Sequence, residues 1–144
     1  MTNKTAQLNE LIEITRDGQR FYEHAREEVK DIGLQSLFSD MALAKTEVIQ
    51  ALSLKVAANH EQPATGGTFA GKCRQIYADT RAMISSDEDA TYIAQLEEAE
   101  DRILHAFEEA LEESEADVRT LLVLEMPKVR ACHDRMRALK KATE

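Results

Sequence analysis

The chain of 144 residues has little of what breaks or cross-links a fold. It contains no tryptophan, two cysteines, two prolines and five glycines, and aromatic residues make up only 5%. A many-stranded sandwich or barrel needs turns every ~8–12 residues, so the scarcity of turn-forming residues argues against one. Two cysteines do not make a disulfide framework, and a reducing, cytoplasmic location is therefore expected.

Long apolar runs and a basic charge excess are also missing. No stretch approaches ~18 consecutive apolar residues, and the N-terminus lacks the apolar core of a signal peptide, so we expect no membrane span and no secretory leader. The formal net charge is −9, from 27 acidic against 18 basic residues. A chain this acidic should not bind nucleic acid or anionic lipid non-specifically. Its length fits a single domain, residues 1–144, with one hydrophobic core.

The sequence does contain helical periodicity along almost its whole length. Apolar residues recur at spacings of three and four from Leu8 to Ile32, and Gly33 is expected to end this first helix. A second stripe follows at once, and residues 60–67 form the one clear cluster of helix breakers. The predicted helices are 5–32, 34–59, 68–85, 87–113 and 115–142.

These helices predict an all-α fold, a ferritin-like four-helix bundle made of two antiparallel hairpins. The hairpins are joined by a long crossover that contains the short helix and can travel back along a bundle ~40 Å long. We expect both hairpin turns to lie at the same end. Ser86 and Ser114, each with an Asp three residues on, are expected to cap the last two helices, and Pro127 is expected to bend the final one without ending it.

Polar residues interrupt the apolar stripes near the middle of the helices. Lys45, Glu100 and Glu125 each lie about 11–13 residues from a hairpin turn, which puts them within a few Å of one level at ~1.5 Å per residue. Thr15 lies about a turn further on. We therefore predict a buried polar layer of Thr15, Lys45, Glu100 and Glu125. An isolated buried charge costs several kcal/mol, so these groups must find partners.

Two partnerships are open. The favoured one is an internal ion pair of Lys45 with Glu100 and Glu125, in which an ammonium takes the place of a metal. The other is a metal site of Glu97, Glu100, Glu125 and His133, since carboxylates and imidazole from facing helices hold di-iron centres. The Glu-x-x-His spacing of those centres is absent. We expect no cofactor, with a single iron or manganese ion as the alternative.

Three segments carry a resemblance to a known family: LNELIEITRDG over 8–18, LEEAED over 96–101 and HDRMRAL over 133–139. With them the whole chain resembles a proteobacterial family of ferritin-like domains of unknown function. This implies a four-helix bundle of the ferritin-like superfamily and names no reaction. Wider relatives such as ferritin, bacterioferritin and rubrerythrin oxidise iron or reduce peroxide at a carboxylate-bridged di-iron centre.

Compared with those relatives, the chain has lost most of the implied ligands. The first-helix Glu position resembles Thr15, the third-helix carboxylate resembles Glu100, and His133 resembles the fourth-helix histidine without its Glu. The resemblance also implies dimerisation through the first two helices, for which Phe21, Ile14 and Leu54 are a candidate seam.

The leading expectation is a non-enzymatic, stress-associated or interaction protein of the bacterial cytoplasm, which forms a homo-oligomer through its helix faces. In this reading the buried layer stands in for a lost metal centre. The competing expectation is a metal-binding oxidoreductase or iron-handling protein with a reduced carboxylate and histidine site. His24 is expected on the helix surface, and Cys73 and Cys132 are expected to pack as small apolar residues.

Overall fold

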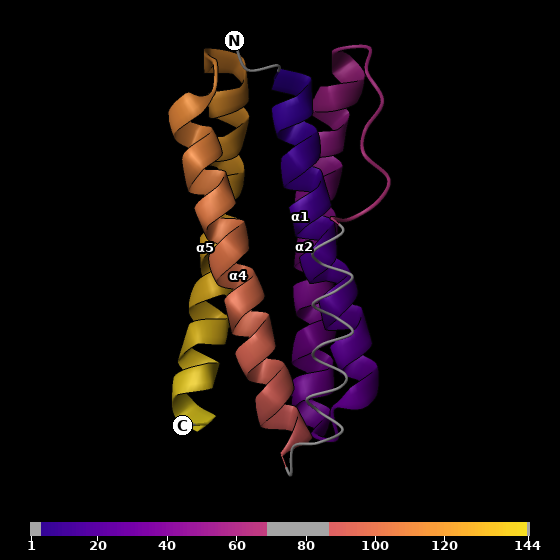
Figure 1. Ribbon diagram of the computed structural model, residues 1–144, viewed down its shortest axis with the longest axis vertical. Coiled ribbons are helices and arrows are strands. Elements are labelled where there is room, and N and C mark those ends of the chain that lie inside the picture. Colours follow the sequence, from indigo (N-terminus) through magenta and orange to yellow (C-terminus); the bar gives the residue numbers. More distant parts are fainter. Residues whose placement is uncertain (1–3, 69–86, 144) are drawn as a thin grey trace.

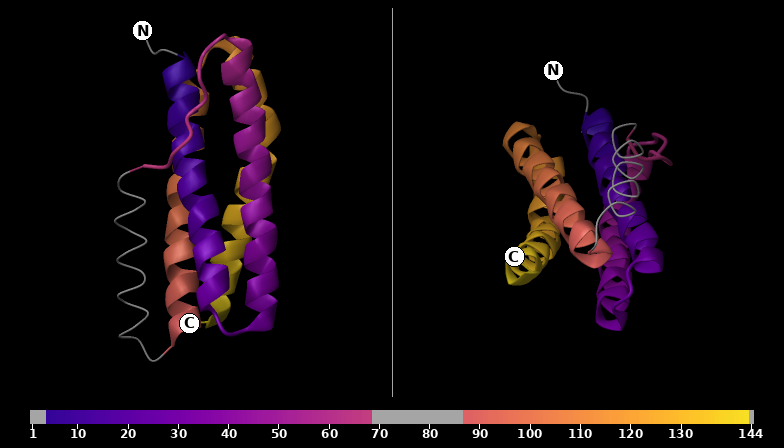
Figure 2. Two further views of the ribbon diagram at one scale, coloured as in Figure 1. Left: turned by 90° about the vertical axis from the view of Figure 1, so that its right-hand side faces the viewer. Right: turned by 60° about the horizontal axis from the view of Figure 1, so that its bottom comes forward.

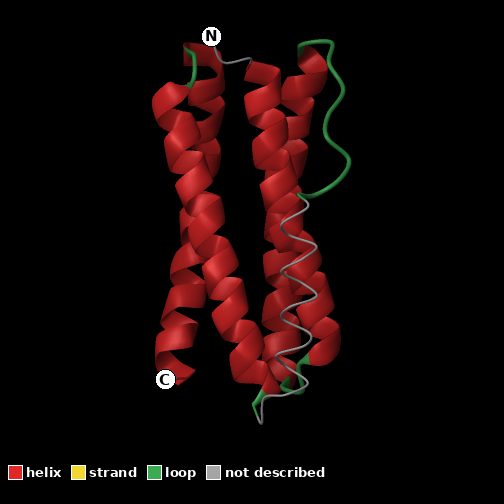
Figure 3. Ribbon diagram, in the orientation of Figure 1, coloured by secondary structure: helices red, strands yellow, loops and turns green. Residues whose placement is uncertain are grey.

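The computed structural model describes residues 4–68 and 87–143, and within these ranges it is all helical, without strands (Figures 1 and 3). Four helices follow one another: α1 (Lys4–Glu28), α2 (Ile32–Ala58), α4 (Glu88–Glu113) and α5 (Ala116–Thr143). The predicted all-α class and the four long helices are thus confirmed. The predicted short helix over 68–85 lies, except for Thr68, outside the described residues.

The helices form two antiparallel hairpins that lie side by side, α1 with α2 and α4 with α5 (Figures 1 and 2). The backbone amides of Lys30 and Asp31, in the turn after α1, donate to Asp89 at the start of α4, at 3.0 and 3.2 Å. At the other end Lys4 lies 3.0 Å from Asp117, next to the turn between α4 and α5. The two turns therefore lie at opposite ends of the bundle, and the prediction of one shared end is wrong. Because α2 and α4 run in the same direction, the second turn must lie away from the first.

The first hairpin turn begins earlier than expected. α1 ends at Glu28 rather than at residue 32, and α2 begins at Ile32. The side chain of Asp31 caps α2 by accepting a hydrogen bond from the amide of Leu34 at 3.0 Å. Gly33 thus lies in the first turn of α2, where it does not adopt positive φ. An aspartate that satisfies a free helix amide sets this boundary, and the glycine does not.

An acidic residue also caps the start of α4, and a serine caps its end. Asp87 caps α4 and accepts from the amide of Ala90 at 3.1 Å, while Ser86 lies outside the described residues. Ser114 is the C-cap of α4, with its hydroxyl donating to the carbonyl of Leu111, so its predicted role as the cap of the next helix is wrong. α5 continues through Pro127, as expected.

A polar layer divides the hydrophobic core into two apolar halves. One half surrounds Phe38 and Leu96, near the first turn, and the other surrounds Leu52 and Phe107, near the second. Lys45 and Glu100 lie between them, at 1% and 0% exposure. None of the described helices is long and apolar enough to cross a lipid bilayer.

Candidate functional site

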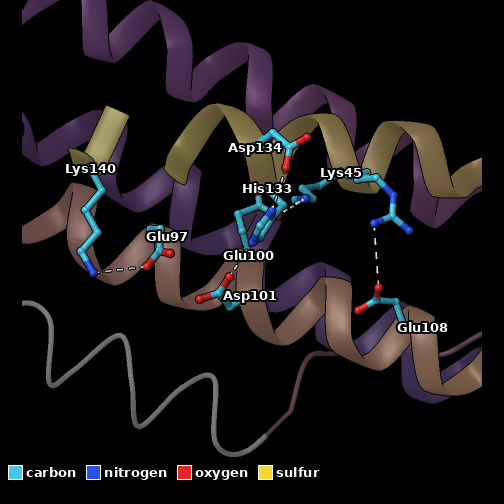
Figure 4. Close-up of polar contacts among 9 residues, drawn as sticks. Lys45, Glu97, Glu100, Asp101, Glu108, His133, Asp134 and Lys140 are labelled. Atoms are coloured by element: carbon cyan, nitrogen blue, oxygen red, sulfur yellow. Dashed lines mark hydrogen bonds and ion pairs between the residues drawn. The ribbon is translucent and has the colours of Figure 1, made fainter. Parts of the chain in front are cut away.

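The candidate site is centred on Glu100, which lies midway along α4 and is completely buried. The ammonium of Lys45, from α2, donates to Oε1 of Glu100 at 2.5 Å (Figure 4). The hydroxyl of Tyr22, from α1, donates to Oε2 at 2.5 Å. Both carboxylate oxygens therefore receive a short hydrogen bond from a side chain that is itself only 1% exposed. Charge-assisted bonds of this kind are about twice as strong as neutral ones.

Small residues on α1 lie beside the long lysine side chain. A methyl group at Gly18 would lie 2.8 Å from Cδ1 of Ile103, which is too close, and 3.7 Å from Cε of Lys45, which is an ordinary contact, so the glycine makes room for Ile103 next to the lysine stem. Thr15 is fully buried, as predicted for the polar layer. Its hydroxyl donates to the carbonyl of Leu11 at 2.6 Å and is satisfied within its own helix.

α5 contributes a thiol to this cluster. Cys132 is 7% exposed. Its burial raises the pKa of the thiol, the nearby Lys45 ammonium lowers that pKa, and the Glu100 charge raises it again, with a net rise. Burial, the Glu100 charge and the hydrogen bond also raise the pKa of Tyr22 well above its ordinary value. Both groups therefore stay protonated at neutral pH, and Tyr22 acts as a donor.

Glu125 lies apart from this cluster, although it was expected within it. It is 8% exposed, and its nearest cation is the ammonium of Lys128, 3.8 Å from Oε1. The same ammonium lies 3.6 Å from Glu47 on α2. The expected ion pair thus contains Lys45 and Glu100, and the prediction that Glu125 shares it is wrong. Seven residues, about 10 Å of helix, separate Glu125 from Cys132, which faces the cluster.

His133 lies between two aspartates. Its Nε2 is 2.6 Å from Asp101 on α4, and its Nδ1 is 3.0 Å from Asp134, the next residue (Figure 4). Burial lowers the pKa of His133, but the hydrogen bonds to Asp134 and Asp101, together with their charges, raise it further, so the pKa lies above its ordinary value. The imidazole thus joins α4 to α5.

The four predicted metal ligands face four different surroundings. Glu97, 9% exposed, lies 3.5 Å from Lys140, while Glu100, Glu125 and His133 face the groups described above. In residues 4–68 and 87–143, no group of three or more His, Cys, Asp or Glu side chains is placed to hold a metal ion. These carboxylates and this imidazole therefore do not fit an iron or manganese centre.

Two partners in the site are not predicted from the sequence. Tyr22 falls within the apolar stripe from Leu8 to Ile32, yet a buried tyrosine hydroxyl needs an acceptor, and this rule points to a buried acid nearby. Asp101 was not singled out, because a half-exposed aspartate beside Glu100 carries no distinguishing signal. His24 was expected on the surface but is partly buried, with Nε2 3.3 Å from the hydroxyl of Tyr92.

One protein-family model matches most of the chain. The model of the family described as a domain of unknown function, DUF2383, matches residues 3–113. The chain belongs to this family. The search of curated proteins gives no significant match.

The match to DUF2383 covers α1, α2 and α4 and stops at the last residue of α4. All three members of the buried cluster, Tyr22, Lys45 and Glu100, therefore lie in the matched part of this DUF2383 chain. Cys132 and His133 lie beyond it. The three matched side chains are at most 1% exposed.

Proposed function

We propose that this DUF2383 chain is a non-enzymatic helical-bundle protein that acts through its surface. In this proposal the Tyr22–Lys45–Glu100 cluster stands at the level where ferritin-like enzymes hold a metal. The observation that carries the proposal is that both oxygens of Glu100 already accept hydrogen bonds, from Lys45 and from Tyr22, at 2.5 Å each.

Electrostatics supports the same proposal. A metal ion bound by Glu100 would compete with the two groups that donate hydrogen bonds to this carboxylate. The Lys45 ammonium would then lie close to a dication, with only the carboxylate between the two positive charges. A buried charge that loses its partner is strongly destabilising, so exchanging the ion pair for a metal is unfavourable. The raised pKa of Tyr22 also disfavours the phenolate form that would bind a metal.

Metal content tests the proposal. The protein is purified from cells grown with added iron or manganese, and bound metal is measured by elemental analysis. We expect less than stoichiometric metal and a melting temperature that does not change with added Mn²⁺. The matched control is the double variant Lys45→Met/Glu100→Gln, which keeps the shape of the pair and removes both charges. One equivalent of metal in the natural protein, absent from the double variant, would overturn the proposal and favour an iron-handling protein.

A further inference from the structure

Three leucines are exposed on α2 and α5. Leu43 is 60% exposed, Leu54 is 73% exposed and Leu124 is 67% exposed. Isolated exposed leucines are normal on protein surfaces. Leu43 and Leu54 share one face of α2, about 16 Å apart along the helix, and Leu124 lies on the neighbouring α5, so their placement calls for an explanation.

The three leucines surround one ion pair. On α2, Glu47 follows Leu43 by one turn and precedes Leu54 by two turns, so all three share a helix face. On α5, Lys128 follows Leu124 by one turn. The Lys128 ammonium lies 3.6 Å from Glu47 and thereby joins the two stripes. We call these five residues, Leu43, Glu47, Leu54, Leu124 and Lys128, the leucine face.

A buried carboxylate beside the leucine face has one oxygen without a hydrogen bond. Oε1 of Glu125 has no hydrogen-bond partner, and its side chain is only 10% exposed. Its nearest cation, Lys128, is 3.8 Å away and is shared with Glu47. Two carboxylates thus compete for one ammonium that is itself 46% exposed, and a buried acceptor left unsatisfied is costly.

We propose that the leucine face binds a second copy of this chain in a two-fold symmetric dimer. A two-fold interface must be complementary to itself. The leucine face meets this condition, because it carries one acid and one base, each about half exposed, between apolar side chains. Rotation of a second copy brings its Lys128 toward Glu47 of the first, and the reverse contact follows by symmetry.

Charge favours a second copy over a foreign partner. The chain carries a net charge of −9, so two copies repel each other over most of their surface. The ion pair makes the leucine face locally neutral, which permits close approach there. A strongly basic partner would leave Lys128 against a like charge, and an acidic one would do the same to Glu47.

The leucine face is the centre of a larger contact. It extends about 16 Å along α2, from Leu43 to Leu54, whereas α2 and α5 have 27 and 28 residues, about 40 Å of helix each, and two neighbouring helices about 10 Å wide present about 800 Å² over that whole length. Stable interfaces bury about this area on each partner. Burial would also remove Lys128 from water and strengthen its attraction to Glu125, since Coulomb energies rise as the local dielectric falls.

This dimer differs from the one that the sequence predicts. Phe21 of the predicted seam is 4% exposed and stacks edge-on against Tyr92, with ring centroids 6.3 Å apart, and Ile14 is partly buried. Leu54 alone of those three residues is largely exposed. The proposed dimer contact therefore lies on α2 and α5, whereas the sequence predicts one on the first two helices.

Sedimentation equilibrium over a concentration series tests the proposal. We expect the natural protein to dimerise and Leu124→Glu to raise the dissociation constant by about tenfold or more. Val123→Glu is the matched control, because Val123 is 53% exposed but lies about 100° further around α5. Circular dichroism melts establish that both variants fold. A natural protein that stays monomeric at every concentration, or equal weakening by the two variants, would overturn the proposal.

A mixing experiment tests the two-fold contact. Glu47→Lys and Lys128→Glu should each dimerise more weakly alone, because like charges then meet across the axis. Mixed together they should form a heterodimer in which both cross-contacts are attractive. Absence of that heterodimer, with both variants folded, would also overturn the proposal.

The inference rests on the proposed function, in which the protein acts through its surface. Measuring the metal content of the same samples distinguishes a failure of the dimer from a failure of the proposed function. A metal-free monomer would contradict the dimer alone, and a metal-loaded dimer would contradict the proposed function alone.

Discussion

Lys45 and Glu100 join diagonally opposite helices through the centre of the bundle. α2 packs against α1 and α5, and α4 packs against the same two helices, so the 2.5 Å contact links two helices that do not lie side by side. Each comes from a different hairpin. The pair therefore fixes how the two hairpins dock, and removing one partner strands the other charge in an apolar core.

Replacing Lys45 with methionine should lower the free energy of unfolding by about 3–5 kcal/mol, because Glu100 then remains buried without a counter-charge. Urea denaturation at neutral pH measures this loss. Arg130→Met is the control: it breaks a contact at 3.8 Å to Glu108 between half-exposed side chains and should cost about 1 kcal/mol at most. Equal stability of Lys45→Met and the natural protein would rule out a structural ion pair.

The double variant Lys45→Met/Glu100→Gln separates a lost charge partner from lost packing. Removing both charges should recover most of the stability that Lys45→Met loses, since buried ion pairs are often replaceable by neutral groups of similar volume. The same urea titrations, arranged as a double-mutant cycle, give the coupling energy. If the two single losses simply added, the side chains would act independently.

Tyr22→Phe should lower the free energy of unfolding by about 1–3 kcal/mol, because it leaves Oε2 of Glu100 without its donor while keeping the ring in place. Tyr92→Phe is a matched control. Its ring is equally buried, but its hydroxyl lies 3.3 Å from the imidazole of His24 and not next to a carboxylate. Denaturation of both variants under identical conditions should show the larger loss for Tyr22→Phe, and the reverse order would contradict the central role of Glu100.

Helical spacing was sufficient to predict the four helices and the central pair. Lys45 and Glu100 lie midway along their helices, so their level is the same whichever end carries the turn. For this reason the pair was predicted correctly even though the turns were placed at the wrong ends. Glu125 lies in the first half of α5, seven residues, or about 10 Å of helix, before Cys132, and this offset from the middle of the helix separates it from the pair.

Periodicity gives the direction of a side chain around its helix but not its neighbour on the next helix. Cys132 reaches the cluster and His133 turns to Asp101, although the two are consecutive residues. Tyr22 and Phe21 are both aromatic positions beside one stripe, and only their contacts separate them. These distinctions depend on how the two hairpins dock, which the sequence of a single helix does not contain.

The thiol of Cys132 should resist aromatic disulfide reagents in the folded protein. It is buried, and its raised pKa leaves little thiolate at neutral pH. The experiment uses a Cys73→Ser variant so that Cys132 is the one thiol, and compares the rate in buffer with the rate in denaturing urea. We expect labelling of the thiol in the folded protein to be slower by about 100-fold or more than in urea. The reagent reaches the thiol only when the structure around it opens locally, so this opening limits the rate. Prompt labelling in buffer would show that the cluster is open to solvent.

The His133 contacts should make stability depend on pH. The pKa of His133 is raised in the folded state above its unfolded value of about 6.5, so the imidazolium binds its two aspartates below that pH, and this contribution is lost as pH rises through the folded pKa. The free energy of unfolding should thus fall as the pH rises above about 6.5. Urea titrations across this range should show a flatter profile for His133→Gln and an unchanged one for His105→Gln, whose 71% exposed side chain faces Glu109 on the surface. A His133→Gln profile as steep as that of the natural protein would assign the pH dependence to other groups.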